Sequence, residues 1–291
     1  MTGTINCLIE KRSLTMESII LSRRDFREYD QIITVYTKEQ GKLELLARGV
    51  KKIVSKNTAH LEPFSYVMVE SVPGKEILHL TTAQPLHTFP FIRSNLESLL
   101  GAQIIVKIVD IIVQVGERDQ RIFSLIKRWL FYVETVAVFN YFLIDGFVMS
   151  LLSLLGFSPI IDKCVVCEKK FSTMVKEELN ASDNKKRGGL YFAGGGLVCP
   201  NCRELKQSVG EEIETCGLKE ISILQILLSG DFHVMNRNQM DEAEIRSVHG
   251  LVMNFAAYHT ERKLPNWTDF CNYGIMANNM TSKTLSKNNN L

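Results

Sequence analysis

The sequence predicts an α+β protein in which a small five-stranded β-barrel precedes an α-helical domain that is interrupted by a four-cysteine element. Short β-rich runs separated by turn residues fill residues 17–88, and apolar residues recur about every 3.6 positions from residue 93 onward. Two C-x2-C pairs then follow, with residues 168–198 between them. A chain of 291 residues with 45% apolar residues is large enough for two domains and a small insert.

The barrel is expected to contain the five runs ESIILSRRDF, YDQIITVYTKEQ, GKLELLARGV, PFSYVMVESV and KEILHLTTA. In the second run, Ile33 and Val35 share one face of the strand, whereas Ile32 and Tyr36 share the other. Gly41 supplies the turn into the third run. Five antiparallel strands in so short a segment suit a small closed barrel of the OB type, although the strand count fits an SH3-like barrel equally well.

Helical periodicity dominates after the barrel, and the spacing of Ser94 and Glu97 matches a capping box that would begin the first long helix. A second helical region follows the four-cysteine element. The predicted organisation is a flexible N-terminal extension over residues 1–16, the OB-type barrel over 17–88, a helical domain over 89–160 and 205–273, a zinc-binding insert over 161–204, and a disordered tail over 274–291.

The strongest motif is formed by Cys164, Cys167, Cys199 and Cys202. Each short pair can direct two thiolates at one ion, and two pairs complete a tetrahedral zinc site without a water ligand, which is typical of a structural metal. The long spacer requires a loop or hairpin between the halves. A redox pair, disulfides and an iron–sulfur cluster are the alternatives. Glu168 stands where such a turn often has glycine.

Catalytic signatures are not apparent in the sequence. Gly41-Lys42 lacks the remainder of a P-loop, and the H-x-E match at His60 lies far from the cysteines and lacks the ligand pattern of a zinc deaminase. The first residues do not resemble a signal peptide, and the cysteine usage suits a reducing compartment. We therefore expect a cytoplasmic protein that is not an enzyme.

The net charge of +2 is too small to indicate nucleic-acid binding, so a basic surface has to be local. Cations gather at the end of the first strand and after the third, where they could neutralise phosphates or simply face solvent. The candidate DNA-binding residues are Arg23, Arg24, Arg27, Arg48, Lys51, Lys52 and Lys56. The nearby aromatic residues Phe26, Tyr29 and Tyr36 could stack on bases or belong to the barrel core.

Three segments resemble the bacterial RecO family of DNA repair and recombination mediators: GKLELLARGVKKIVSKNTAHLEPFS, LLGFSPIIDKCVVC and YFAGGGLVCPNC. The resemblance extends over residues 17–264. The middle segment is the most specific of the three, because an LGFxP run directly before a C-x2-C pair is rarely found elsewhere.

This resemblance implies an OB-type barrel, a helical domain and a zinc-binding insert, without enzymatic activity. It also implies binding of single- and double-stranded DNA, annealing of complementary strands, and help in loading RecA onto strands coated by single-strand-binding protein. The implied partners are RecR and the acidic carboxyl tail of the single-strand-binding protein, in the bacterial cytoplasm near the nucleoid. Two rival hypotheses remain: a zinc-stabilised module that binds only protein, and a zinc hydrolase or deaminase with an open coordination position.

Overall fold

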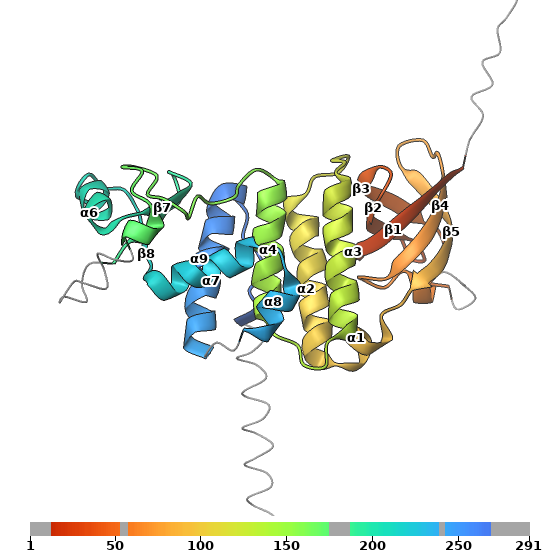
Figure 1. Cartoon of the computed structure of the whole chain (residues 1–291). Helices are drawn as coiled ribbons and strands as arrows, with labels where there is room; N and C mark the ends of the chain where they lie inside the picture. Colours follow the sequence, from red (N-terminus) through yellow and green to blue (C-terminus); the bar gives the residue numbers. More distant parts are fainter. Residues whose placement is uncertain (1–12, 53–57, 175–186, 239–241, 269–291) are drawn as a thin grey trace, which may run out of the picture. The chain divides into compact units, whose positions relative to one another are not determined.

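The structure is a computed structural model that describes residues 13–52, 58–174, 187–238 and 242–268 (Figure 1). The chain divides into two compact units, Met1–Thr135 and Val136–Leu291. The first unit contains a β-barrel and the helices α1 (Pro90–Ser94), α2 (Leu96–Ile112) and α3 (Gln120–Thr135), and the second contains further helices and a small sheet. In the described part of the chain, no helix combines the length and the apolar character needed to cross a membrane.

The barrel of the first unit is closed, with the strand order β1-β2-β3-β5-β4. Strands β3 and β5 run parallel, whereas the other neighbouring strands are antiparallel. The five-stranded OB-type barrel that the sequence predicts is thereby confirmed. The expectation that all five strands are antiparallel is wrong, because β3 and β5 close the barrel as a parallel pair. The strands are β1 (Leu14–Asp25), β2 (Gln31–Thr37), β3 (Gly41–Ala47), β4 (Tyr66–Val72) and β5 (Leu78–His87).

Closure depends on the long strand β1, which pairs with two neighbours. Its first half pairs with β4, and its second half pairs with β2. The register shifts between Ile20 and Ser22, so that a β-bulge bends the strand where it passes from one partner to the other. A 12-residue strand can therefore turn the corner of a small barrel without losing its pairing.

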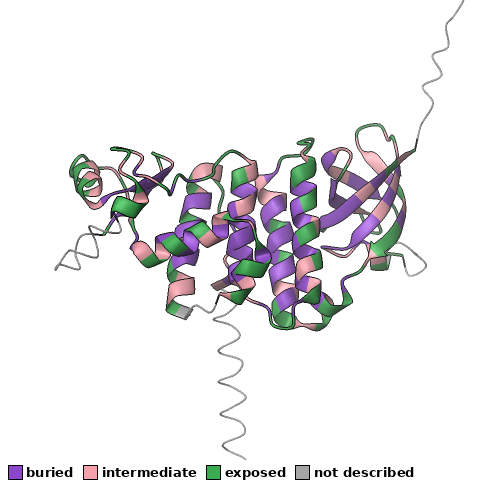
Figure 2. Cartoon of the chain, viewed as in Figure 1, coloured by how far each residue is buried: buried purple, intermediate pink, exposed green. Residues whose placement is uncertain are grey.

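Strand β2 is buried on both faces (Figure 2). Ile33 and Val35 lie in the barrel core, as their alternation predicts, together with Leu45 of β3. On the opposite face, Tyr36 is fully buried, and its hydroxyl donates a hydrogen bond to the carbonyl oxygen of Asp119 at 3.0 Å. Helix α2 packs on the neighbouring strand β1. The outer side of this part of the barrel is therefore an internal surface of the first unit.

Lys42 joins β3 to the end of helix α2 (Leu96–Ile112). Its side chain is 8% exposed, and its ammonium group donates to the carbonyl oxygens of Asp110 at 2.5 Å and Val113 at 2.8 Å. The Asp110 carboxylate lies 3.1 Å from the same nitrogen. A cation at the last carbonyls of a helix satisfies acceptors that have no partner within the helix. Gly41 fits beside it because any Cβ would lie 1.9 Å from the carbonyl oxygen of Glu117.

Helix α3 (Gln120–Thr135) is joined to the barrel by a second polar contact. Lys127 Nζ lies 2.9 Å from Glu17 and 2.6 Å from the Tyr66 hydroxyl, which also donates a hydrogen bond to Glu17. Lys38 approaches the same carboxylate at 3.1 Å. Burial raises the pKa of Glu17, but the hydrogen bonds from Tyr66, Lys127 and Lys38 outweigh it and hold the pKa at about 2.

The predicted capping box at the start of the long helix is wrong by one residue. Ser94 is the last residue of the short helix α1 (Pro90–Ser94), and its hydroxyl donates to the carbonyl oxygen of Phe91. Asn95 is the N-cap of α2, and its side-chain oxygen accepts from the Ser98 backbone at 2.9 Å. Asparagine is as good an N-cap as serine. The capping-box spacing therefore predicted the start of the helix to within one residue but named the wrong capping residue.

The second unit is organised around helix α4 (Phe142–Leu154), most of whose residues are buried (Figure 2). Three further helices contact α4: α7 (Leu218–Leu228), α8 (Phe232–Arg237) and α9 (Glu242–Thr260). A helix that is apolar on most of its sides is expected to be buried among other helices, as α4 is. The predicted helical region after the barrel is thus present. Its helices α1 to α3 fall in the first compact unit, and α4 is separated in the sequence from α7, α8 and α9 by the cysteine-bearing segment.

A buried polar cluster joins α4 to α9. Asp145 is fully buried, and its carboxylate lies 2.6 Å from Nδ1 of His249. The other ring nitrogen lies 2.6 Å from the side-chain oxygen of Asn266, which also accepts a hydrogen bond from the Thr268 backbone. Both ring nitrogens therefore have an oxygen partner within hydrogen-bond distance, so the buried ring is held at both of its polar atoms. Burial raises the pKa of Asp145, and the attraction of His249 opposes that rise.

Candidate metal centre and nucleic-acid interface

The four predicted cysteine ligands are brought together in the second unit by a small sheet and a helix. Strands β6 (Gly189–Tyr191) and β7 (Gly196–Val198) form a hairpin, with β8 (Glu214–Thr215) on the other edge of β6. Cys199 directly follows β7, and Cys202 lies in the first turn of α6 (Pro200–Ser208). The first pair occupies a turn held against β7, because the Val165 backbone donates to the Leu197 carbonyl at 2.8 Å.

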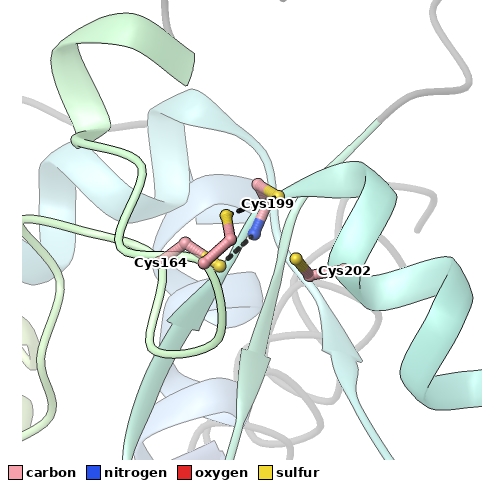
Figure 3. Close-up of side chains that lie close together, drawn as sticks. Cys164, Cys199 and Cys202 are labelled. Atoms are coloured by element: carbon pink, nitrogen blue, oxygen red, sulfur yellow. Dashed lines mark hydrogen bonds between the residues drawn. The ribbon is translucent and has the colours of Figure 1, made fainter.

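The sulfur atoms of Cys164, Cys167, Cys199 and Cys202 all lie within 4.8 Å of one another. The side chains in Figure 3 converge from the turn and from the start of α6. The sulfurs of Cys167 and Cys199 are 3.7 Å apart, which is too long for a disulfide and close to the ~3.8 Å between thiolates of a tetrahedral zinc site with ~2.3 Å bonds. The cluster could therefore hold a metal ion, as the spacing predicts.

The electrostatics of the cluster also suit a cation. Burial raises the pKa of Cys164, but backbone N–H groups of Cys167 and Cys199 outweigh it and bring the pKa to about 7. One of these bonds is from the Cys199 nitrogen to the Cys164 sulfur at 3.4 Å. Burial and the neighbouring cysteines raise the pKa of Cys202. Four thiolates this close repel one another, and a divalent cation would remove that repulsion.

The residue after the first cysteine pair confirms that a glycine-like conformation is needed there. Glu168 has a φ of 60°, in the left-handed region that L side chains rarely adopt. Its backbone nitrogen donates to the Cys164 carbonyl at 2.9 Å, which closes the turn around the thiolates. Arg203, after the second pair, lies inside helix α6 and needs no such conformation.

The predicted basic surface of the barrel contains carboxylates as well as cations. Three of the predicted DNA-binding residues form ion pairs, which are Arg23 with Glu62 at 2.8 Å, Arg24 with Glu44 at 3.4 Å, and Lys51 with Asp25 at 2.9 Å. Lys56 lies outside the described residues, and Arg48 is exposed. The surface is therefore less positive than the count of its lysines and arginines indicates.

Two segments of this surface are joined by hydrogen bonds. The turn between β1 and β2 accepts a bond at the Tyr29 carbonyl oxygen from the Lys51 backbone at 3.1 Å. The Asp30 carboxylate accepts another from the Gly49 backbone at 2.8 Å. Arg27 and Lys52 are thereby carried on adjoining segments. Sequence reasoning missed Asp30, because nothing in the local pattern indicates that its side chain binds a residue nineteen positions later.

The three aromatic residues near this surface divide into two groups. Tyr36 is fully buried, which confirms the core alternative for this residue and excludes base stacking. Phe26 and Tyr29 are 46% and 47% exposed. Each carries a cation over its ring: the Arg27 guanidinium lies 5.1 Å from the Phe26 centroid, and Lys52 Nζ lies 5.6 Å from the Tyr29 centroid.

Two family models and several curated proteins match most of this chain. The family model "Recombination protein O N terminal" matches residues 12–89, and "Recombination protein O C terminal" matches residues 93–268. A protein named "DNA repair protein RecO" from Desulforamulus reducens is 28% identical over 255 residues, with 86% of this chain and 90% of the relative covered. Proteins of the same name from Pelotomaculum thermopropionicum and a Thermoanaerobacter species are 24% and 26% identical, covering 89% and 90% of this chain and 93% and 98% of those relatives.

Proposed function

Because the chain belongs to the recombination protein O family, we propose that it is a bacterial DNA repair and recombination mediator that binds single- and double-stranded DNA. It anneals complementary strands and assists the loading of RecA onto strands coated by single-strand-binding protein. Its partners are RecR and the acidic tail of the single-strand-binding protein, and it works in the cytoplasm near the nucleoid without enzymatic activity.

The observation that carries the DNA-binding proposal is the pair of hydrogen bonds that hold the β1–β2 turn against the segment after β3. They place Arg27, Lys51 and Lys52 on neighbouring segments of an OB-type barrel. Cations grouped in this way neutralise phosphates and release counterions, which gives an affinity that depends on salt and little on sequence.

The ion pairs on this surface weaken the proposal only modestly. Exposed pairs are worth about 0.2–1 kcal/mol each, because water screens both charges. The side chains of Arg24 and Lys51 are 58% and 39% exposed, so a phosphate can replace the carboxylate partner of either one. Annealing then follows physically, since a protein that neutralises phosphates on two strands lowers their mutual repulsion without making or breaking a bond.

For the metal centre we propose one structural zinc ion held by Cys164, Cys167, Cys199 and Cys202. Four cysteine sulfurs within reach of one ion fill a tetrahedral shell, which would leave no position for a water or substrate. When bound, such an ion supplies a cross-link between the cysteine turn and helix α6. This argues against a zinc hydrolase or deaminase, which needs an open position.

Strand annealing is the direct test. Complementary labelled oligonucleotides are mixed with and without the protein, first bare and then coated with single-strand-binding protein. We expect faster annealing in both cases. Arg48→Ala and Lys52→Ala should weaken binding and flatten the slope of log K against log salt by ~0.7 per lost contact on single strands. Lys219→Ala, at a position 81% exposed in the second unit, is the control and should change neither.

The rival function is a zinc-stabilised module that binds only protein, and the three ion pairs within the basic surface are the observation in its favour. It predicts no shift of labelled single strands at low or moderate salt. Zinc binding together with an absence of DNA binding in this assay would decide for it.

A further inference from the structure

Phe26 and Tyr29 are unusual among the aromatic residues of the barrel because they face solvent. Tyr36, Phe64 and Tyr66 are each less than 9% exposed, as aromatic side chains of a small barrel commonly are. Phe26 and Tyr29 are about half exposed on one short turn between β1 and β2. Two large rings kept in water on a single turn contribute little to the stability of the fold.

The turn that carries the two rings is held in one conformation by its backbone. The nitrogens of Phe26 and Arg27 both donate to the carbonyl oxygen of Asp30, at 3.1 and 3.4 Å. The bonds from Gly49 to the Asp30 carboxylate and from Lys51 to the Tyr29 carbonyl fix the turn against the neighbouring segment. The rings are therefore presented on a fixed backbone, which lowers the entropy lost when a ligand binds.

The charges around the rings indicate the chemistry of the ligand. Arg27 lies over the Phe26 ring and Lys52 over the Tyr29 ring, so each ring face is accompanied by a cation. An acid, Glu28, is exposed and meets the Tyr29 hydroxyl at the ring edge, away from the stacking face. A polymer with a flat group and an anion in every repeating unit matches this arrangement. The loop between strands 1 and 2 is also one that OB-type barrels use to bind oligonucleotides.

We propose that Phe26 and Tyr29 are a base-stacking pair that recognises unpaired bases of single-stranded nucleic acid. The inference rests on the proposed DNA binding and adds the feature that distinguishes single strands from duplex. In a duplex the base faces are already stacked on their neighbours and cannot reach the rings. In a single strand they are accessible, and Arg27 and Lys52 neutralise the adjacent phosphates.

Stacking by the rings and phosphate binding by the cations can be distinguished by measurement. Stacking is worth ~1–3 kcal/mol per base, or about 5- to 150-fold in affinity. It releases no counterions, so loss of a ring should shift the whole salt-dependence line without changing its slope, whereas loss of a phosphate-binding cation flattens the slope. Duplex affinity should be almost unaffected by loss of the rings.

The test measures binding of labelled oligothymidine and of a blunt duplex to the full-length chain at several salt concentrations. For Phe26→Ala, Tyr29→Ala and the double variant, we expect single-strand affinity to fall by about 5- to 150-fold per ring, with unchanged slope and less than about a twofold change on duplex. Tyr258→Ala removes a ring that is 52% exposed in the second unit and is the matched control. Circular dichroism confirms that each variant is folded.

A conservative replacement makes the test specific to stacking. Phe26→Trp and Tyr29→Trp should retain single-strand affinity, and the new tryptophan fluorescence should be quenched by oligothymidine but not by duplex. Alanine variants that bind oligothymidine as tightly as the unaltered protein, or that lose single-strand and duplex binding equally, would overturn the stacking pair. Failure of the unaltered protein to bind either nucleic acid would instead reject the proposed function.

Discussion

Replacing Lys42 by methionine should destabilise the first unit strongly, although the substitution keeps the length and most of the apolar stem of the side chain. The lysine is 8% exposed, and its ammonium group has three acceptors at 2.5–3.1 Å, two of them carbonyls at the end of α2. Methionine removes the donor and leaves the Asp110 carboxylate, whose side chain is 16% exposed, without its principal partner.

Breaking a buried ion pair by removing one partner costs about 3–5 kcal/mol, most of it the penalty of the charge left behind. Lys107→Met is the matched control, because Lys107 approaches the same carboxylate at 3.8 Å with a side chain 57% exposed. Its loss should cost at most about 0.5 kcal/mol. If the stranded carboxylate is the cause, adding Asp110→Asn to Lys42→Met should recover part of the loss.

Urea unfolding gives the free energies, and hydrogen exchange of β3 and the end of α2 assigns the loss to the first unit, since a chain of two units need not unfold in one step. We expect exchange at these amides to rise in Lys42→Met and to remain unchanged in Lys107→Met. Equal, small effects of the two substitutions would refute the idea that Lys42 connects the barrel to the helices.

Four further predictions follow from the contacts described. Cys202→Ser should abolish stoichiometric zinc binding in metal analysis and lower the melting temperature of the second unit, and chelator treatment should do the same to the unaltered protein. Glu17 should contribute about 1–2 kcal/mol to the free energy of unfolding after solvent screening. This contribution should be complete above pH 4.5 and should fall as the pH decreases toward 2. Urea titrations of Glu17→Gln should not show this pH dependence. Asp145→Asn should cost about 1–3 kcal/mol, because it removes the carboxylate that holds Nδ1 of the buried His249 ring, and urea unfolding that shows no loss would contradict this role of Asp145. Glu168→Gly should raise stability by about 1 kcal/mol by relieving a left-handed backbone, whereas Glu168→Ala should not.

The sequence is sufficient for the features that depend on short-range pattern. Alternation at Ile33 and Val35 predicts the barrel core, and the spacing of the cysteine pairs predicts their convergence. The core residues of the strand are near neighbours in the chain, so their alternation can be read directly. The cysteine pairs are far apart in the chain, but paired cysteines at this spacing have few uses other than binding a metal. The helix start at Asn95 was missed by one residue because several residue types cap equally well.

Features that depend on partners distant in the chain could not be predicted. Counting Arg23, Arg24 and Lys51 as cations overstates the charge of the surface, because the carboxylates that neutralise them come from other strands and loops. The sequence left both stacking and burial open for Tyr36, because alternation along a strand does not tell whether its outer face meets water or a helix. The exposure of Phe26 and Tyr29 likewise follows from where the turn lies in the fold.

The connection between Lys42 and the end of α2 bears on how the protein can be divided for experiments. A fragment cut after β5 contains all five strands of the barrel, but it would strand a buried ammonium group and uncover the outer face of β2, where Tyr36 and Ile32 are buried. Such a fragment should be poorly soluble. A recombinant piece that ends at Thr135 keeps every acceptor of that lysine and is the smallest cut we would make for crystallisation with an oligonucleotide.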